Sequence, residues 1–123
     1  MARILVVEDE ALVARLIPKQ LAGLHDVTVV HDAAMALEML HMEQFDLVLS
    51  DINMPGKSGV ELHDELTRRG TPARIIFITG GTNPEVTNFL ARVPNKWLTK
   101  PYSREQLIAA IDAELASVPA SSH

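Results

Sequence analysis

The sequence predicts an α/β fold, a doubly wound sheet of five parallel strands with helices on both faces. Short apolar runs alternate along the chain with longer segments whose apolar residues recur at helical spacing. This alternation is typical of strand–helix units that cover both faces of a parallel sheet. The 123 residues are also enough for one such domain with a buried core. We therefore expect a single domain over 1–123, with its core at about 3–116 and a flexible tail at 117–123.

Five apolar runs are the expected strands. They cover residues 3–7, 27–30, 45–50, 74–78 and 97–99. In an open parallel sheet the carboxyl ends of the strands share one edge, and ligands bind outside that edge. Residues that directly follow these runs are therefore the first candidates for a functional site.

The first helix is expected over about 10–23, with a proline inside it. Pro18 cannot donate a hydrogen bond to the carbonyl of Ala14, and its ring collides with the preceding turn. We predict a kink or an early helix end at this position.

Residues that cap helices mark the start of the other four. They are Asp32 for the second helix, Ser58 with Glu61 for the third, Asn83 before Pro84 for the fourth, and Ser103 with Gln106 for the fifth. The third helix is expected to run toward Gly70. Apolar residues that recur at helical spacing should face the core, namely Val86, Phe89 and Leu90 in the fourth helix and Leu107, Ile108, Ile111 and Leu115 in the fifth.

Composition and charge exclude several classes of protein. The absence of cysteine excludes disulfides, thiolate nucleophiles and cysteine-based zinc sites. No apolar stretch is long enough to cross a membrane and the first residues lack a signal-peptide pattern, so we expect a soluble, cytoplasmic protein. The net charge of −5 and the lack of a Lys/Arg cluster argue against direct nucleic-acid binding. His25, His31, His41 and His63 are expected on the surface, without metal-ligand spacing.

Polar side chains follow four of the expected strands. Glu8 and Asp9 follow the first, Asp51 the third, Thr79 the fourth and Lys100 the fifth. Because the strand ends share an edge, we expect these groups to converge. Carboxylate oxygens are the ligands that Mg²⁺ prefers, and a hydroxyl and an ammonium group can donate to phosphoryl oxygens. The pattern predicts a magnesium site that accepts a phosphoryl group.

Charge balance predicts a role for each group. A phosphoryl group that moves onto a carboxylate brings negative charge beside an acid, so the site must supply cations. Asp9 and Asp51 are expected to bind Mg²⁺ directly, and Glu8 through a bound water. A backbone carbonyl in the turn after Asp51, that of Asn53, completes the expected ligand set, and Lys100 balances the nucleophile.

Each feature also has an ordinary explanation. Acids at 8–10 are typical of the first turn of a helix, Asp51 of a turn, Thr79 of a strand end and Lys100 of a solvated surface. Their joint occurrence at four strand ends, in this order, favours a functional site.

These residues resemble the receiver domains of two-component response regulators, over roughly residues 3–116. The resemblance includes the acid pair Glu8 and Asp9, the phosphoacceptor Asp51, the turn Asn53-Met54-Pro55, and Gly59, Thr79 and Lys100-Pro101. It implies a flavodoxin-like fold with strand order 2-1-3-4-5 and a cis peptide bond between Lys100 and Pro101. It also implies a phosphoacceptor that depends on Mg²⁺, receives its phosphoryl group from a histidine kinase or a histidine phosphotransfer protein, and has no enzymatic activity beyond accepting and slowly losing that group.

The resemblance further implies a conformational switch. In the family the threonine hydroxyl turns toward the phosphoryl group, and an aromatic side chain three residues before the lysine moves inward. That position is Trp97 here, where Tyr or Phe is more usual, and static packing of the indole is the alternative. Gly80 and Gly81 leave the phosphate-facing edge open, so we expect a short-lived phosphorylated state.

The resemblance leaves the setting of the module open. Segments 79–81 and 92–96 are similar to receiver modules of hybrid histidine kinases, and a free-standing regulator fits the length equally well. Receivers often pair through the fourth and fifth helices, so a monomer or a weak homodimer is expected.

Three other functions compete with this interpretation. Haloacid-dehalogenase-type phosphatases use a similar Asp but need a second Asp two residues later as general acid, and that position is Asn53. A flavin carrier would need a phosphate-binding first loop, whereas this one carries three acids. A receiver that serves only as an interaction module would be expected to lack at least one of the key residues, and all are present.

Overall fold

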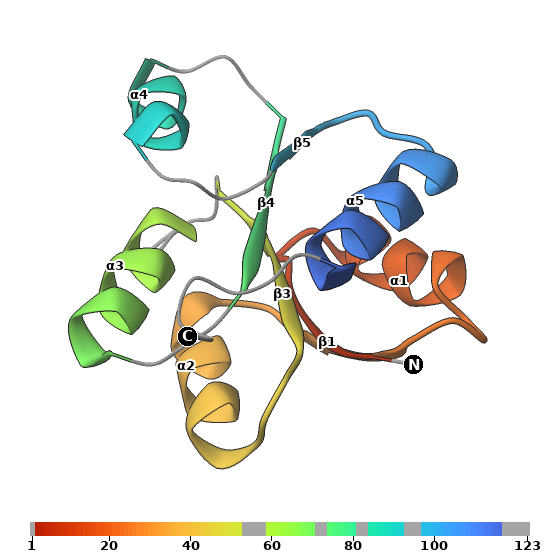
Figure 1. Cartoon of the computed structure of the whole chain (residues 1–123), viewed down its shortest axis with the longest axis horizontal. Coiled ribbons are helices and arrows are strands. Elements are labelled where there is room, and N and C mark those ends of the chain that lie inside the picture. Colours follow the sequence, from red (N-terminus) through yellow and green to blue (C-terminus); the bar gives the residue numbers. More distant parts are fainter. Residues whose placement is uncertain (1, 53–58, 71–73, 81–83, 93–96, 117–123) are drawn as a thin grey trace.

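The structure is a computed structural model, and it describes residues 2–52, 59–70, 74–80, 84–92 and 97–116. Five parallel strands form one sheet in the order β2-β1-β3-β4-β5 (Figure 1). The strands are β1 Arg3–Val7, β2 Asp26–Val30, β3 Leu47–Asp51, β4 Ile75–Thr79 and β5 Trp97–Thr99. The predicted fold class and strand order are confirmed.

One helix follows each strand. The helices are α1 Ala11–Gln20, α2 Ala33–Met42, α3 Gly59–Arg69, α4 Pro84–Arg92 and α5 Arg104–Ala116. Helices α1 and α5 cover one face of the sheet, while α2, α3 and α4 lie on the other (Figure 1). Among the described helices, none has the length and apolar character that a bilayer span requires.

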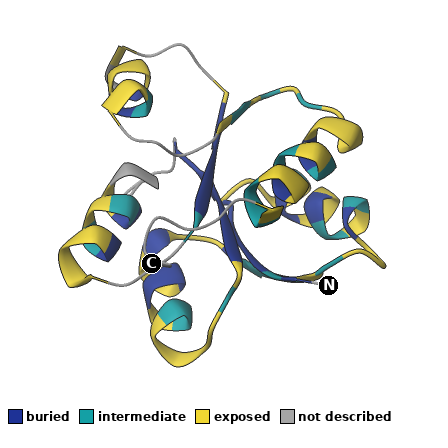
Figure 2. Cartoon of the chain, in the orientation of Figure 1, coloured by how far each residue is buried: buried dark blue, intermediate teal, exposed yellow. Residues whose placement is uncertain are grey.

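The two faces of the sheet carry separate hydrophobic cores. Along β1, Leu5 and Val7 pack into the core shared with α2, α3 and α4, while Ile4 and Val6 pack into the core shared with α1 and α5. This alternation follows from the two-residue period of a strand. Every residue of β3 and β4 is buried, and the helices expose their outer sides (Figure 2). Strands β3 and β4 therefore support the residues at their carboxyl ends from within the packed core.

Two of the predicted helix caps are present as hydrogen bonds. The Asp32 carboxylate accepts from the backbone N–H of Met35 at 2.8 Å. Ser103 Oγ accepts from the backbone N–H of Gln106 at 3.0 Å, and Gln106 Oε1 accepts in return from that of Ser103 at 2.8 Å. Helix α4 begins at Pro84, as predicted. The expected caps at positions 58 and 83 lie outside the described residues.

Helix α1 is shorter than predicted. It ends at Gln20, three residues before the expected end, and Pro18 stands in its last turn. The early end agrees with the missing donor of proline, which withdraws one hydrogen bond from the end of the helix. Strand β3 starts at Leu47 rather than at 45 and includes Asp51 as its last residue.

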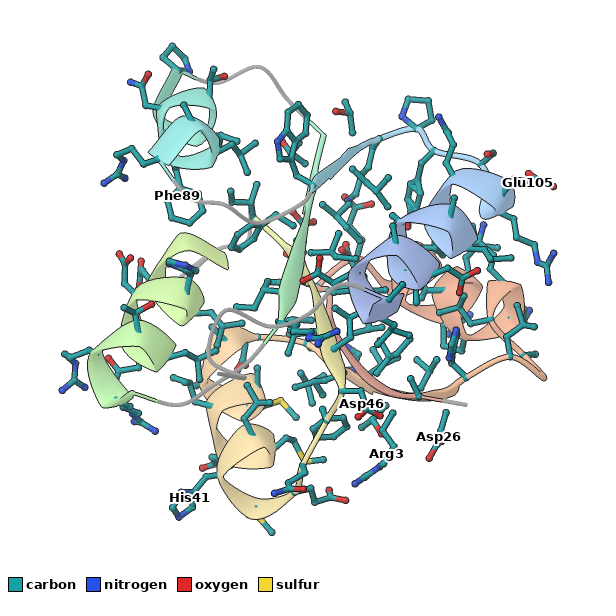
Figure 3. All side chains as sticks on the ribbon, viewed as in Figure 1. Arg3, Asp26, His41, Asp46, Phe89 and Glu105 are labelled. Carbon is teal, nitrogen blue, oxygen red and sulfur yellow. The ribbon has the colours of Figure 1, made fainter. Side chains whose placement is uncertain are left out.

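The expectation that His63 lies on the surface is wrong. Its side chain is 21% exposed, and its ring lies 5.5 Å from that of Phe89 and 6.0 Å from that of Phe77, centroid to centroid. Phe89 reaches from α4 toward α3 (Figure 3), so His63 fills part of the contact between these helices and β4. An imidazole is flat and largely apolar in its ring carbons, which allows this packing despite its polar atoms.

Candidate functional site

The register of the sheet brings the predicted site residues to one edge. Strands β1, β3, β4 and β5 are consecutive neighbours, and their carboxyl ends lie together. Asp51 is the last residue of β3 and pairs with Ile78 of β4. Thr79 ends β4, and its carbonyl accepts from the backbone N–H of Lys100 at 2.7 Å. Residues separated by up to about ninety positions in sequence thus form one site because adjacent strands end at the same level.

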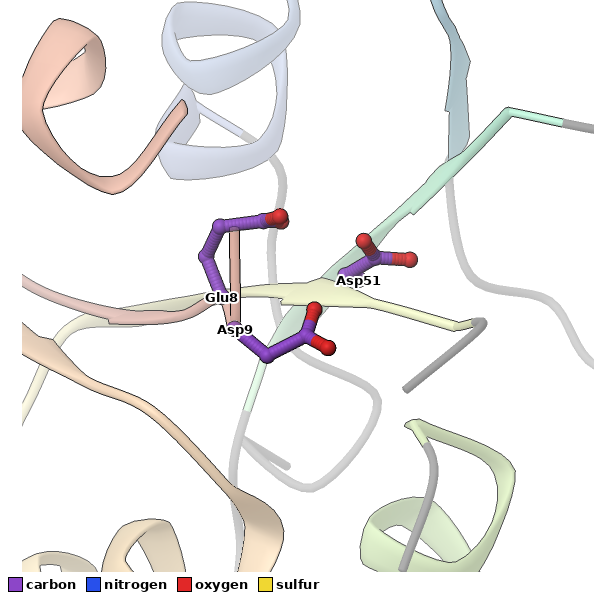
Figure 4. Close-up of side chains that lie close together, drawn as sticks. All are labelled: Glu8, Asp9 and Asp51. Atoms are coloured by element: carbon purple, nitrogen blue, oxygen red, sulfur yellow. The ribbon is translucent and has the colours of Figure 1, made fainter. Parts of the chain in front are cut away.

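Three carboxylates converge at this edge. Glu8, Asp9 and Asp51 each have one oxygen within 4.8 Å of those of the other two, and Figure 4 shows them between the ends of β1 and β3. Glu8 and Asp51 are buried, whereas Asp9 is exposed. Such an arrangement of like charges is unfavourable unless cations compensate it.

Lys100 supplies one of these cations. Its ammonium group donates to Asp51 Oδ2 at 3.1 Å and lies 3.7 Å from Glu8 Oε1 and 3.8 Å from Glu10 Oε1. Burial opposes the charge of Lys100, but the hydrogen bond to Asp51 and the charges of Asp51, Glu8 and Glu10 outweigh it and raise the pKa of the lysine. Lys100 is therefore protonated throughout the neutral range.

The environment of Glu8 disfavours its ionisation. Burial, followed by the negative charge of Asp51, raises its pKa from 4.5 to about 7, although Lys100 acts in the opposite direction. Its Oε1 accepts from the backbone N–H of Glu10 at 3.3 Å. Its Oε2 is buried and has no hydrogen-bond partner among the described groups. A buried carboxylate oxygen of this kind is able to accept a hydrogen bond from a metal-bound water.

The donor set fits Mg²⁺. Carboxylates are hard oxygen ligands, and one or two of them with bound waters are a common protein contribution to a magnesium site. Asp9 and Asp51 offer oxygens at the edge of the cluster, and Glu8 Oε2 is available for a metal-bound water. The predicted ligand Asn53 lies outside the described residues.

A cavity of about 470 Å³ adjoins the carboxylates. Among the described residues it is lined by Glu10, Asp51, Gly80, Lys100 and Pro101. A side chain at Gly80 would bring its Cβ to 3.6 Å from Lys100 Cδ, an ordinary contact distance, so glycine here keeps the cavity wide without being sterically required. The peptide bond between Lys100 and Pro101 is cis.

Thr79 and Trp97, the two residues of the predicted switch, lie in different environments. The Thr79 side chain is buried beside the site at 2% exposure. Trp97, the first residue of β5, is 50% exposed. The role of Trp97 as a switch stays a prediction.

Glu10 was not assigned a role by the sequence analysis, yet its carboxylate lines the cavity and approaches Lys100. Its position directly after the acid pair was the available signal. Sequence position alone could not show that the side chain turns toward the cavity rather than toward the N-terminus of α1.

Comparison with known proteins identifies the family. Residues 4–112 match the response regulator receiver domain. The chain belongs to this family. It is a receiver domain of the two-component signalling systems, whose members bind Mg²⁺ at an acidic pocket.

Individual relatives cover the chain almost completely. The response regulator receiver protein CpdR of Brucella abortus is 37% identical over 121 residues, 94% of this chain and 98% of that protein. The transcriptional regulatory protein YkoG of Bacillus subtilis is 33% identical over 115 residues, and the chain spans about half of its length (50%). The structure of Vibrio cholerae chemotaxis protein CheY4 superposes on this chain with a TM-score of 0.81, and the two sequences are 28% identical. The superposed region covers 92% of this chain and 98% of the CheY4 chain.

Proposed function

We propose that this receiver domain takes a phosphoryl group from a phosphohistidine onto Asp51 and changes its surface in response. The observation that carries the proposal is the Asp51 carboxylate at the end of β3, held by Lys100 at 3.1 Å beside Glu8 and Asp9. The donor is a histidine kinase or a histidine phosphotransfer protein, and the role of the domain is signalling rather than turnover of a substrate. The protein acts in the cytoplasm as a monomer or as a weak homodimer through α4 and α5.

Asp51 is the nucleophile of the proposed transfer. One of its carboxylate oxygens forms a bond to phosphorus as the phosphorus–nitrogen bond of phosphohistidine breaks, and the bonding electrons leave with the imidazole nitrogen. Lys100 balances the charge of Asp51 before transfer and that of the phosphoryl oxygens afterwards. Mg²⁺ bound by Asp9, Asp51 and the carbonyl of Asn53, with Glu8 acting through a water, would neutralise negative charge on those oxygens.

Thr79 and Trp97 are proposed to convert phosphorylation into a change of surface. The Thr79 hydroxyl donates to a phosphoryl oxygen, and the space that it leaves admits the indole from its half-exposed position on β5. Gly80 beside the cavity leaves a path for attacking water, which limits the lifetime of the phosphorylated state.

Chemical phosphorylation tests the proposal. Acetyl phosphate with Mg²⁺ should add one phosphoryl group to the chain, seen by intact-mass spectrometry, and Asp51→Asn should abolish the addition because a carboxamide is not a nucleophile of this kind. Asp46→Asn is the matched control, since Asp46 is exposed and caps the backbone N–H of Arg3 outside the site. Full labelling of the Asp51→Asn variant would place the phosphoacceptor elsewhere.

The same preparation distinguishes a phosphatase. The position two residues after Asp51, where haloacid-dehalogenase-type enzymes carry their general acid, is Asn53. We therefore expect no turnover of p-nitrophenyl phosphate, measured by release of p-nitrophenolate. Sustained turnover that is lost in Asp51→Asn would contradict the proposed signalling function and would indicate a phosphatase.

A further inference from the structure

Glu10 is a fourth carboxylate at the site, and like Asp9 it is exposed. Its oxygen Oε1 lies 3.8 Å from Lys100 Nζ, and its side chain is 65% exposed, so it stands at the mouth of the cavity. Glu8 and Asp51, by contrast, are buried, and Asp51 also lines the cavity. A phosphodonor that reaches Asp51 through this cavity therefore comes close to Glu10.

The side chain of Glu10 does not cap a helix. Glu10 is the N-cap residue of α1, but its side chain makes no capping hydrogen bond. The backbone supplies the local contacts instead, because the N–H of Glu10 donates to Glu8 Oε1 at 3.3 Å and its carbonyl accepts from Ala14 at 2.9 Å. A residue that could have stabilised the helix start is directed toward the cavity.

We propose that Glu10 is a specificity-determining residue that disfavours strongly anionic phosphodonors, such as acyl phosphates, relative to donors with a phosphorus–nitrogen bond. The inference rests on the proposed phosphorylation of Asp51. Glu10 offsets part of the charge of Lys100, the group on which an anionic donor depends for its approach. It also repels each negative charge of the donor directly, and the repulsion is larger for a donor that carries more of them.

The chemistry of the two donor classes explains the selection. An acyl phosphate such as acetyl phosphate brings two negative charges, and its phosphorus–oxygen bond breaks to release acetate. Phosphoramidate is a small analogue of phosphohistidine whose nitrogen is protonated, so its net negative charge is smaller. Its phosphorus–nitrogen bond breaks to release neutral ammonia, which keeps its protons. A carboxylate at the mouth of the cavity attracts this protonated nitrogen and repels the acyl phosphate.

The test compares Glu10→Gln with the unmodified chain, using both donors at low ionic strength and saturating Mg²⁺. The rate constant for phosphorylation by acetyl phosphate, from intact-mass time courses, should rise about two- to five-fold, the range expected for an exposed charge pair. The rate with phosphoramidate should rise less or fall. Added salt should shrink the difference, because the side chain is exposed to screening ions.

A binding measurement complements the rates. The affinity for beryllofluoride, an anionic mimic of the phosphoryl group, should increase by a similar factor in Glu10→Gln when measured by calorimetry with Mg²⁺ present. Glu38→Gln is the matched control, since it removes the same charge from an exposed position on α2 that does not line the cavity. This control should match the unmodified chain in both rates and in affinity.

The outcomes separate this inference from the proposed function. If Asp51→Asn abolishes labelling while Glu10→Gln leaves the ratio of the two rates unchanged at low salt, Asp51 stands as phosphoacceptor and the role of Glu10 is refuted. A slower reaction with acetyl phosphate in Glu10→Gln would refute it as well. If no donor labels the chain, both proposals are overturned together.

Discussion

Lys100 is a countercharge for three carboxylates at once, those of Asp51, Glu8 and Glu10. Its side chain is 21% exposed and that of Asp51 4%, so their interaction is screened less by water than that of a surface pair. Removal of the lysine would leave Asp51 and Glu8 without their cation. The free-energy cost of an unpaired buried charge is much larger than the stabilisation that the ion pair provides.

We therefore expect Lys100→Met to slow phosphorylation of Asp51 strongly. A charge-assisted hydrogen bond contributes about 1.5–3 kcal/mol, which corresponds to a rate about ten- to a hundred-fold lower with acetyl phosphate at fixed Mg²⁺. Intact-mass time courses measure the rate. Lys19→Met changes an exposed lysine in the last turn of α1 and should leave the rate as it was. An undiminished rate in Lys100→Met would show that the charge of the phosphoryl group is balanced without this residue.

At the residue scale, the sequence identified the groups of the site but not their environments. Glu8, Asp9, Asp51, Thr79 and Lys100 were predicted because each directly follows or ends an apolar run. Which of two consecutive acids is buried depends on the direction of the backbone after β1. The sequence around these two acids does not specify that direction. Glu8 proved fully buried and Asp9 exposed, and burial is the main cause of the raised pKa of Glu8.

Helix caps are the best predicted feature at the element scale. Asp32 and the pair Ser103 and Gln106 were identified from residue type and spacing alone, because a cap acts within three residues of itself. The packing of His63 between α3 and α4 was missed, since it depends on Phe77 and Phe89, which are brought there only by the folded sheet. A helix cap can therefore be predicted from local sequence, whereas this packing of His63 between two helices and a strand cannot.

The cap of α2 yields a prediction for stability. Asp32→Ala removes the acceptor for the backbone N–H of Met35, so the free energy of unfolding should fall by about 0.5–2 kcal/mol. Urea unfolding followed by circular dichroism measures the change. Asp32→Asn is the control, because the asparagine carbonyl accepts the same hydrogen bond and should retain most of the stability. Equal losses in the two variants would mean that the charge of Asp32, rather than its hydrogen bond, stabilises α2.

At the scale of the whole molecule, the fold class followed from the alternation of apolar runs and helical segments. The order of strands did not, because nothing within a single strand specifies its neighbours. The order 2-1-3-4-5 came from the resemblance to receiver domains, and the structure has the same order. This order makes the carboxyl ends of β1 and β3 adjacent, which is the condition for Glu8 and Asp9 to meet the distant Asp51 in one cluster.

The acid cluster predicts how the stability of the whole domain depends on pH. The pKa of Glu8 is about 7 in the folded protein and 4.5 in an ordinary environment. The folded state therefore holds this proton more tightly than the unfolded chain does between these values. By linkage, the stability that protonated Glu8 contributes is complete below about pH 4.5 and is lost as the pH rises through about 7.

Without Mg²⁺, the unmodified chain should therefore become less stable relative to Glu8→Gln as the pH rises from 5 to 8. The measured quantity is the difference between the free energies of unfolding of the two proteins.

Mg²⁺ should reverse this trend, because it binds the ionised carboxylates. Its binding adds RT ln(1 + [Mg²⁺]/Kd) to the free energy of unfolding, about 2.7 kcal/mol at a hundred times Kd. The gain should be larger at pH 8 than at pH 5.5, and a chelator should remove it. Urea unfolding at a series of pH values, with and without Mg²⁺, measures both effects. Parallel curves for the two proteins would show that Glu8 does not titrate in this range, whereas an equal gain from Mg²⁺ at both pH values would place the metal away from the cluster.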